Sequence, residues 1–138
     1  MTPPIRAFLV TCYEVPGVAV RIGRRSAAMD ALLARHGVRR AGFVTAWNPR
    51  SRRMPEGWNL RMQDRLRQAA RGRVLAEGFG RGAGWAEHHL LLRGDPRRLR
   101  VLGRRFRQWA IVVVAAGRPA RLVACLVACL AQPGRRPG

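Results

Sequence analysis

A group of amide and hydroxyl side chains follows an apolar, strand-like run at residues 42–46. Its members are Thr45, Asn48, Ser51 and Asn59. Such side chains donate and accept hydrogen bonds, so together they could hold a small polar or anionic ligand. The same residue types also bond neighbouring backbone groups in turns, and a structural turn is the preferred interpretation of this motif taken alone.

The position of this group follows from Pro49. Proline lacks the N–H donor that a sheet needs and pushes the residue before it toward extended geometry, so the chain is predicted to leave the sheet at Asn48. The charged segment 50–57 contains Pro55 and is predicted to be an exposed loop. Asn59 is then predicted to cap a helix, whose free backbone N–H groups would suit an anion.

Acid–base chemistry has a weaker basis. Glu87, His88 and His89 supply a carboxylate and two imidazoles. Neighbouring residues of a strand point to opposite faces, so the two histidines cannot reach one centre. The sequence shows no nucleophile–base pair, phosphate loop or metal-ligand spacing, and two thiols in an apolar run, Cys125 and Cys129, are typical of packing. Catalysis therefore ranks below binding, and no metal or cofactor is predicted.

Charge suggests an alternative partner. The formal net charge is +20, and all 27 basic residues are arginine. A predicted helix that begins at Asp95 is the most basic segment, and nucleic acid could bind at Arg97, Arg98, Arg100, Arg104, Arg105 and Arg107, with tryptophans as stacking surfaces. Arginine without lysine is also typical of GC-rich coding sequence. Weak, non-specific binding of polyanions is expected in either case.

Length and composition predict one small domain at residues 1–131, followed by a disordered basic tail at 132–138. The three cysteines, Cys12, Cys125 and Cys129, have no framework spacing, which favours a reducing cytoplasm without disulfides. No apolar run approaches the roughly 20 residues of a membrane span, so no membrane association is predicted.

The hydrophobic pattern predicts an α/β fold, with α+β possible: a mixed or antiparallel sheet of about six strands with three helices. Strands are predicted at 8–15, 18–22, 42–46, 74–77, 87–92 and 110–115, with a last hairpin segment from 122 whose second half could be helical instead. Helices are predicted after caps at Ser26, Asn59 and Asp95. The alternate glycines at 78–84 are interpreted as a flexible loop, because a dinucleotide fingerprint would need a helix where a strand follows.

Several landmarks together resemble a family of short bacterial proteins known as domain of unknown function 3293. They are T-A-aromatic-N-P-x-S at 45–51, the helix asparagine Asn59, W-x-E at 85–87 and F-x-Q at 106–108. The resemblance implies an α/β domain with a shared polar cluster of Asn48, Ser51, Asn59, Glu87 and Gln108, and no known activity. The chain departs from the family pattern at His89, where serine is usual, and at Trp109, where asparagine is usual.

These observations favour a binding module for a small polar or anionic ligand at the 45–51 turn, with Thr45, Asn48, Ser51, Asn59, Glu87 and Gln108 as its residues. Nucleic-acid binding by the helix at 97–107 is the alternative. The apolar stretch 122–131 also leaves a protein partner open.

Overall fold

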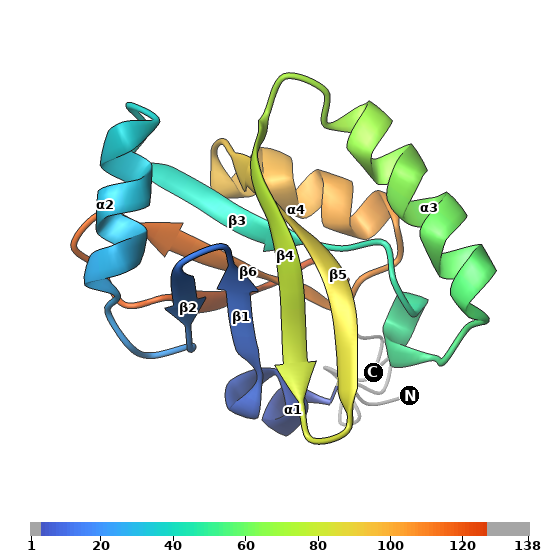
Figure 1. Cartoon of the computed structure of the whole chain (residues 1–138). Coiled ribbons are helices and arrows are strands. Elements are labelled where there is room, and N and C mark those ends of the chain that lie inside the picture. Colours follow the sequence, from blue (N-terminus) through green and yellow to red (C-terminus); the bar gives the residue numbers. More distant parts are fainter. Residues whose placement is uncertain (1–3, 127–138) are drawn as a thin grey trace, which may run out of the picture.

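A computed structural model describes residues 4–126. Its elements are α1 (Ile5–Val10), β1 (Cys12–Val15), β2 (Val18–Val20), α2 (Ala27–Arg35), β3 (Arg40–Val44), the 3₁₀ turn η1 (Pro49–Ser51), α3 (Glu56–Ala69), β4 (Val74–Gly82), β5 (Trp85–Arg93), α4 (Pro96–Arg105), β6 (Ala110–Ala115) and β7 (Arg121–Ala124) (Figure 1). The strands form one seven-stranded sheet in the order β2-β1-β4-β5-β3-β6-β7, and every neighbouring pair is antiparallel.

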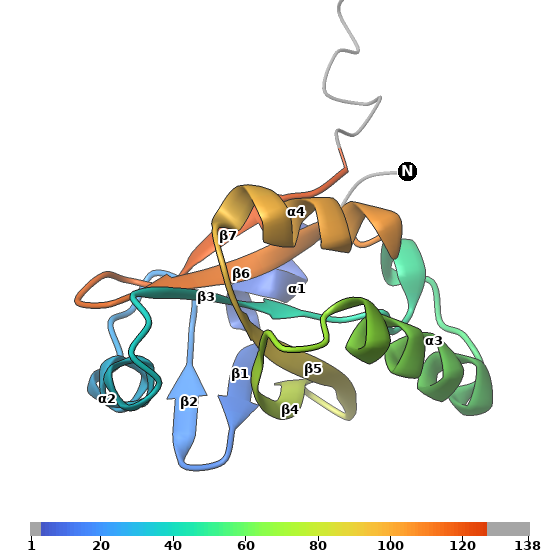
Figure 2. The same ribbon diagram turned by 90° about the horizontal axis from the view of Figure 1, so that it is seen from above.

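The sheet curls, so that its two outer strands approach each other (Figure 2). Ile22, just after β2, forms an isolated parallel bridge with Ala120, just before β7. The amide of Gly23 donates to the carbonyl of Ala120 at 2.7 Å, and the amide of Ala120 donates to the carbonyl of Arg24 at 3.1 Å. These contacts join the first and last segments of the sheet.

The curled sheet has an inner and an outer face, each with its own core. Because side chains alternate along a strand, Phe43, Leu91 and Val112 share the inner face, where they form a core with α2. The helix α2 contributes Met29, Leu32 and Leu33 to this core. On the outer face, α3 and α4 pack against β3, β5 and β6 through buried Leu66, Leu99 and Leu102 among others.

The single small α/β domain and the antiparallel form of its sheet confirm the predicted fold class. Two predicted caps are also confirmed. The Ser26 hydroxyl accepts from the Met29 amide at 3.0 Å, and the Asp95 carboxylate accepts from the Arg97 amide at 2.8 Å. The tail predicted at 132–138 and the segment 127–131 lie outside the described residues. Within residues 4–126, no helix has the length and apolar character to cross a bilayer.

The strand predicted at 8–15 is wrong in its first half. Residues Ile5–Val10 form α1, and β1 begins only at Cys12. The helix ends where the Thr11 hydroxyl donates to the carbonyl of Ala7 at 2.6 Å. A short apolar run is compatible with either a strand or a helix, so its pattern could not distinguish them.

The flexible loop predicted at 78–84 is also wrong. The strand β4 continues to Gly82, and of these glycines only Gly84 lies in the turn to β5, with φ of +74°. A Cβ atom on Gly78 would lie 1.7 Å from the backbone oxygen of Glu14, and one on Gly80 would lie 2.7 Å from the imidazole of His89. These glycines therefore allow β1 and an aromatic ring to approach the strand. The described residues contain seven strands and four α-helices rather than about six and three.

Candidate functional site

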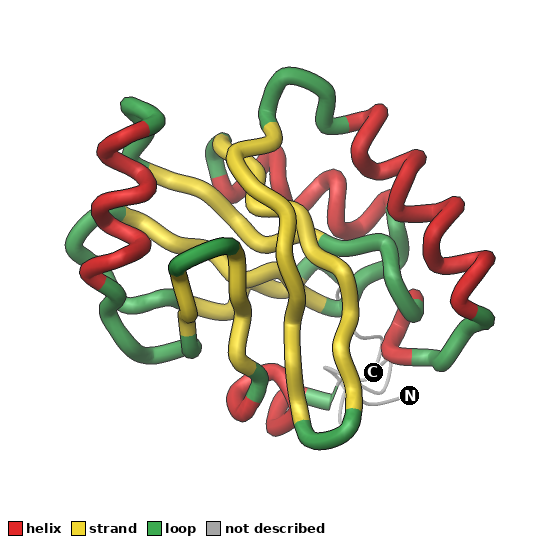
Figure 3. Tube along the Cα trace, in the orientation of Figure 1, coloured by secondary structure: helices red, strands yellow, loops and turns green. Residues whose placement is uncertain are grey.

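One pocket of about 660 Å³ lies at the end of the inner face that α2 leaves uncovered. It is surrounded by α1, the β4–β5 turn and the connection from β3 to α3, which gather around the lower end of the sheet in Figure 3. All six residues predicted to bind a ligand line it: Thr45, Asn48, Ser51, Asn59, Glu87 and Gln108. The fold thus brings together side chains from three separate parts of the sequence.

Asn48 is the centre of the polar network. Its backbone has left-handed geometry, with φ of 45°, and its amide donates to Asn59 Oδ1 at 3.0 Å. The side-chain oxygen of Asn48 accepts from the Met54 amide and from Asn59 Nδ2, both at 2.9 Å. Its Nδ2 donates to Glu87 Oε1 at 3.0 Å. One side chain therefore connects the turn, α3 and β5.

Asn59 does not cap the helix, contrary to the prediction. The helix α3 begins at Glu56, directly after Pro55, whose ψ of 144° is not helical. Asn59 lies inside the first turns, 2% exposed, and its amide donates to the carbonyl of Pro55 at 3.0 Å. Since this amide is already bonded, the reason for expecting an anion at Asn59 is removed.

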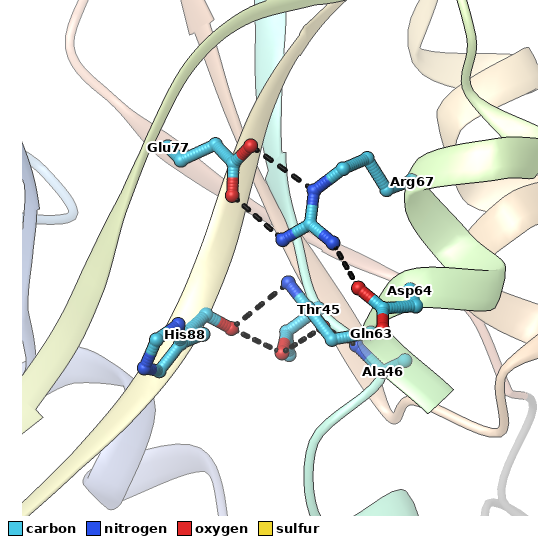
Figure 4. Close-up of polar contacts among 7 residues, drawn as sticks. All are labelled: Thr45, Ala46, Gln63, Asp64, Arg67, Glu77 and His88. Carbon is cyan, nitrogen blue, oxygen red and sulfur yellow. Dashed lines mark hydrogen bonds and ion pairs between the residues drawn. The ribbon is translucent and has the colours of Figure 1, made fainter. Parts of the chain in front are cut away.

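Gln63 is a structural residue that the sequence reasoning missed. Figure 4 shows it between the end of β3 and β5, where its Oε1 accepts from the Ala46 amide at 2.8 Å and its Nε2 donates to the carbonyl of His88 at 3.3 Å. The Thr45 hydroxyl donates to the same carbonyl at 2.5 Å and accepts from the Trp47 amide at 3.0 Å. The spacing of positions 59, 63, 66 and 70 was the available signal, since it places Gln63 on the buried stripe of α3.

The surface beyond Gln63 carries an ion-pair cluster outside the pocket. The Arg67 guanidinium contacts Glu77 Oε1 at 2.7 Å and also bonds Asp64 (Figure 4). The hydrogen bond from Arg67 is the largest cause that lowers the pKa of Glu77, and the positive charge of Arg67 also lowers it. Glu77 and Glu87 are thus two carboxylates of the β4–β5 pair whose pKa values shift in opposite directions.

Glu87 shares the inner face with two aromatic residues. Tyr13 and Glu87 both lie opposite Gly80, and His89 lies opposite Gly78. The rings of Tyr13 and His89 meet edge to face, with centroids 5.6 Å apart. Burial raises the pKa of Glu87, an effect that the Asn48 hydrogen bond partly offsets. Burial is also the largest cause that raises the pKa of Tyr13, and it lowers the pKa of His89 to about 4.

His89 is therefore neutral at pH 7, and its tautomer follows from one contact. Its Nδ1 lies 3.1 Å from the backbone oxygen of Glu87. A carbonyl oxygen only accepts hydrogen bonds, so the proton resides on Nδ1 and Nε2 is left as an acceptor. His88 lies on the opposite face, stacked on Trp47 with centroids 5.0 Å apart. The two imidazoles thus face different surroundings, as predicted.

The remaining predicted residues differ in how firmly they are held. Gln108 is buried, and its Nε2 donates to the backbone oxygens of Trp47 at 3.1 Å and Phe106 at 3.3 Å. Ser51 is exposed at the pocket, with φ of 61°, and its hydroxyl has no hydrogen-bond partner within residues 4–126. Across this same part of the chain, no three His, Cys, Asp or Glu side chains gather as a metal site requires.

The predicted arginine surface lies away from the pocket. Arg97, Arg98, Arg100, Arg104, Arg105 and Arg107 are all exposed on or just after α4, which covers the outer face. Trp47 and Trp109 are buried, and their indole nitrogens have no partner in the described part of the chain. Trp85, 42% exposed, lies on the inner face with Glu87. The exposed aromatic ring and the arginines are therefore on different sides of the sheet.

Comparison with known proteins gives one match. No curated protein and no solved structure matches the chain. The model of the family described as "Protein of unknown function (DUF3293)" matches residues 44–111, a segment that contains all six residues predicted from the sequence to form the site. The chain therefore resembles the DUF3293 family over the segment that builds most of the pocket, as its sequence motifs predicted.

Proposed function

We propose that this chain binds a small polar molecule in the pocket lined by Asn48 and Glu87. The observation that carries the proposal is the convergence of all six predicted residues on one cavity of about 660 Å³. That volume lies within the roughly 300–1,000 Å³ of small-molecule sites. Aromatic and apolar residues such as Phe8, Tyr13 and Phe43 complete the lining, and this mixture is typical of ligand pockets.

The competing interpretation is that these polar groups only satisfy the backbone. It accounts well for Thr45, Asn59 and Gln108, whose side chains bond the chain itself. It does not account for Glu87, since its Oε1 accepts from Asn48 while Oε2 has no hydrogen-bond partner within residues 4–126. The hydroxyl of Ser51 also has no hydrogen-bond partner within these residues. Hydrogen-bonding capacity therefore remains for a ligand.

A thermal-shift screen against metabolites, nucleotides and metals at near-physiological salt tests the proposal. A ligand that binds only the folded state raises the melting temperature by mass action, equivalent to about 2.7 kcal/mol at one hundred times Kd. The shift is expected to disappear in Trp85→Ala, at the pocket, and to persist in Val101→Ala, which is 64% exposed on α4. Asn48→Ala, which breaks the central network, is examined beside them.

If no compound shifts the wild-type protein, the proposal fails. It also fails if every shift is equal in Trp85→Ala and wild type, because the binding would then lie elsewhere. Trp85 is partly exposed and its replacement should leave the fold intact, so this comparison holds even if Asn48→Ala does not fold.

Nucleic-acid binding is the second candidate. The observation in its favour is the exposure of all six arginines at α4, none of which forms an ion pair within the described residues. Binding that depends on this helix should weaken in Arg97→Gln/Arg98→Gln and remain in the equally charged control Arg35→Gln/Arg39→Gln. A structure or sequence preference that survives about 150 mM salt supports it. Equal losses in both variants would indicate a non-specific charge effect.

A further inference from the structure

The charge on the pocket differs from the charge on the whole chain. The protein carries a formal charge of +20 with 27 basic and 7 acidic residues. Charged side chains that line the pocket are Arg53, Glu56 and Glu87. His89 is neutral there at pH 7 because its pKa is about 4. The pocket is therefore locally acidic in a strongly basic protein.

Glu87 is the unusual member of this set. Four of the seven acidic side chains form ion pairs with arginine: Glu14, Asp64, Glu77 and Asp95. Glu87 is partly buried and forms no ion pair within residues 4–126. Its one side-chain hydrogen bond comes from Asn48. A partly buried carboxylate without a cation leaves a demand for positive charge or N–H donors.

Asn48 also determines how Glu87 is presented. Its Nδ2 donates to Oε1 at 3.0 Å, and the other bonds of Asn48 hold that amide in place. The orientation of the carboxylate is thus fixed by the turn, and Oε2 keeps its lone pairs for another donor. A prearranged acceptor of this kind reduces the ordering cost of binding.

The rest of the cavity indicates the body of the ligand. Beyond Glu87, Tyr13 and Phe43 form the inner wall of the cavity, with ring centroids 5.7 Å apart and almost all of their surface buried. Trp85 lies beside Gly82, where a Cβ atom would be 2.3 Å from its indole, so the ring rests over the glycine backbone. Phe8 from α1 also lines the cavity. These surfaces suit a planar or apolar group.

We infer that the pocket takes a small molecule with a protonated amine head at Glu87 and a planar apolar body against the aromatic rings. This inference rests on the proposed function, because it specifies the ligand class of the same pocket. An anionic head is disfavoured at Glu87, since the carboxylate would oppose it. Hydrogen bonds between charged groups provide the expected preference for the amine.

Three probes with the same phenyl body test the inference: phenethylamine, 2-phenylethanol and 3-phenylpropionate. Affinities are measured by calorimetry at pH 7.5 and about 150 mM salt. The amine is expected to bind about tenfold or more tightly than the alcohol and the acid, the factor that corresponds to one charge-assisted hydrogen bond. Larger amines with an indole or naphthyl body extend the series if the phenyl group fills the cavity incompletely.

Glu87→Gln is the decisive variant, and Glu77→Gln is its matched control. Both remove one carboxylate from the β4–β5 pair, but Glu77 pairs with Arg67 outside the pocket. Glu87→Gln is expected to reduce the preference for the amine to less than about threefold, since a neutral amide still accepts from Asn48. Glu77→Gln is expected to retain the full preference.

The outcomes separate the two proposals. If alcohols or acids bind more tightly than the amines and lose affinity in Trp85→Ala, the inference about the ligand class is overturned while the proposed pocket function stands. An amine preference that survives in Glu87→Gln also overturns the inference. If neither these probes nor any compound of the wider screen binds, both proposals fail.

Discussion

Partial burial disfavours the charged form of Glu87 in the folded protein. Burial raises its pKa above the usual value of 4.5, so the folded state holds the proton more tightly than the unfolded state. Wild-type stability therefore rises as the pH falls through the raised pKa toward 4.5, and is lower above that range. Such an arrangement is typical of a residue retained for binding at the expense of stability.

Glu87→Gln is accordingly expected to raise the melting temperature at pH 8, because it removes the buried charge while keeping an acceptor for Asn48. The gain should shrink as the pH approaches 4.5 and Glu87 becomes protonated. Thermal melts of both proteins from pH 8 to pH 4.5 measure this. A variant that is less stable than wild type at pH 8 would show that the carboxylate stabilises the fold.

His89 has the opposite effect on stability. Burial lowers its pKa from 6.5 to about 4, so the unfolded state binds the proton more tightly between these values. Stability is lost as the pH falls from 6.5 toward 4, and the loss due to His89 between pH 7 and pH 5 is about 2 kcal/mol. Urea unfolding of wild type and His89→Phe at these two pH values isolates it, because the contribution of Glu87 is common to both proteins. An equal acid loss in His89→Phe and wild type would contradict the assignment of the effect to His89.

The sequence identified some residues of the site and not others. Asn48 and Glu87 were identified because a polar residue beside a proline and a family-like W-x-E pattern are visible in the chain. Tyr13 and Gln63 were missed as site residues, since their roles depend on which strand lies beside β4 and on the buried stripe of α3. Non-local pairing, rather than local pattern, placed them.

Among the elements, β4 shows how local composition misled the prediction. Four glycines at alternate positions are typical of a flexible loop, yet three of them lie in a strand because neighbouring groups occupy the space of their side chains. By contrast, β6 was predicted with its correct bounds, since an apolar run between clear turns has one reasonable interpretation. The hydrophobic pattern predicted β6, whose side chains are buried on both faces of the sheet. It failed for β4, whose glycines leave room for neighbouring groups.

Gly78→Ala should therefore be severely destabilising. Its Cβ would overlap the backbone oxygen of Glu14 at 1.7 Å, and the backbone of β1 cannot move without breaking its pairing with β4. We expect a loss of about 3 kcal/mol or more in the free energy of unfolding, measured by urea denaturation.

Gly57→Ala provides the matched comparison. A Cβ atom there would meet only the end of the Arg61 side chain at 3.6 Å, which is an ordinary contact. Because alanine favours helix over glycine, this change in α3 should be neutral or stabilise by up to about 1 kcal/mol. If both substitutions had equal effects, the close approach of β1 to β4 would not be the cause.

At the scale of the whole molecule, a charge of +20 on 138 residues makes repulsion a measurable part of the stability. Salt shortens the range of this repulsion from about 30 Å at 0.01 M to about 8 Å at 0.15 M. The melting temperature should therefore rise over this interval in NaCl. The slope should be smaller in Arg97→Gln/Arg98→Gln/Arg100→Gln, and a melting temperature that falls with salt would contradict this account.

The bridge between Ile22 and Ala120 has a consequence for how the protein folds and opens. It joins residues near the two ends of the described chain, so it closes a very long loop, and contacts of this kind form slowly. We expect this junction to form last and to open first, while the β4–β5 hairpin stays paired. Hydrogen exchange should then be faster at the amides of Gly23 and Ala120 than at Leu90 or Leu91. The curled sheet would open locally at this junction before its central strands unfold.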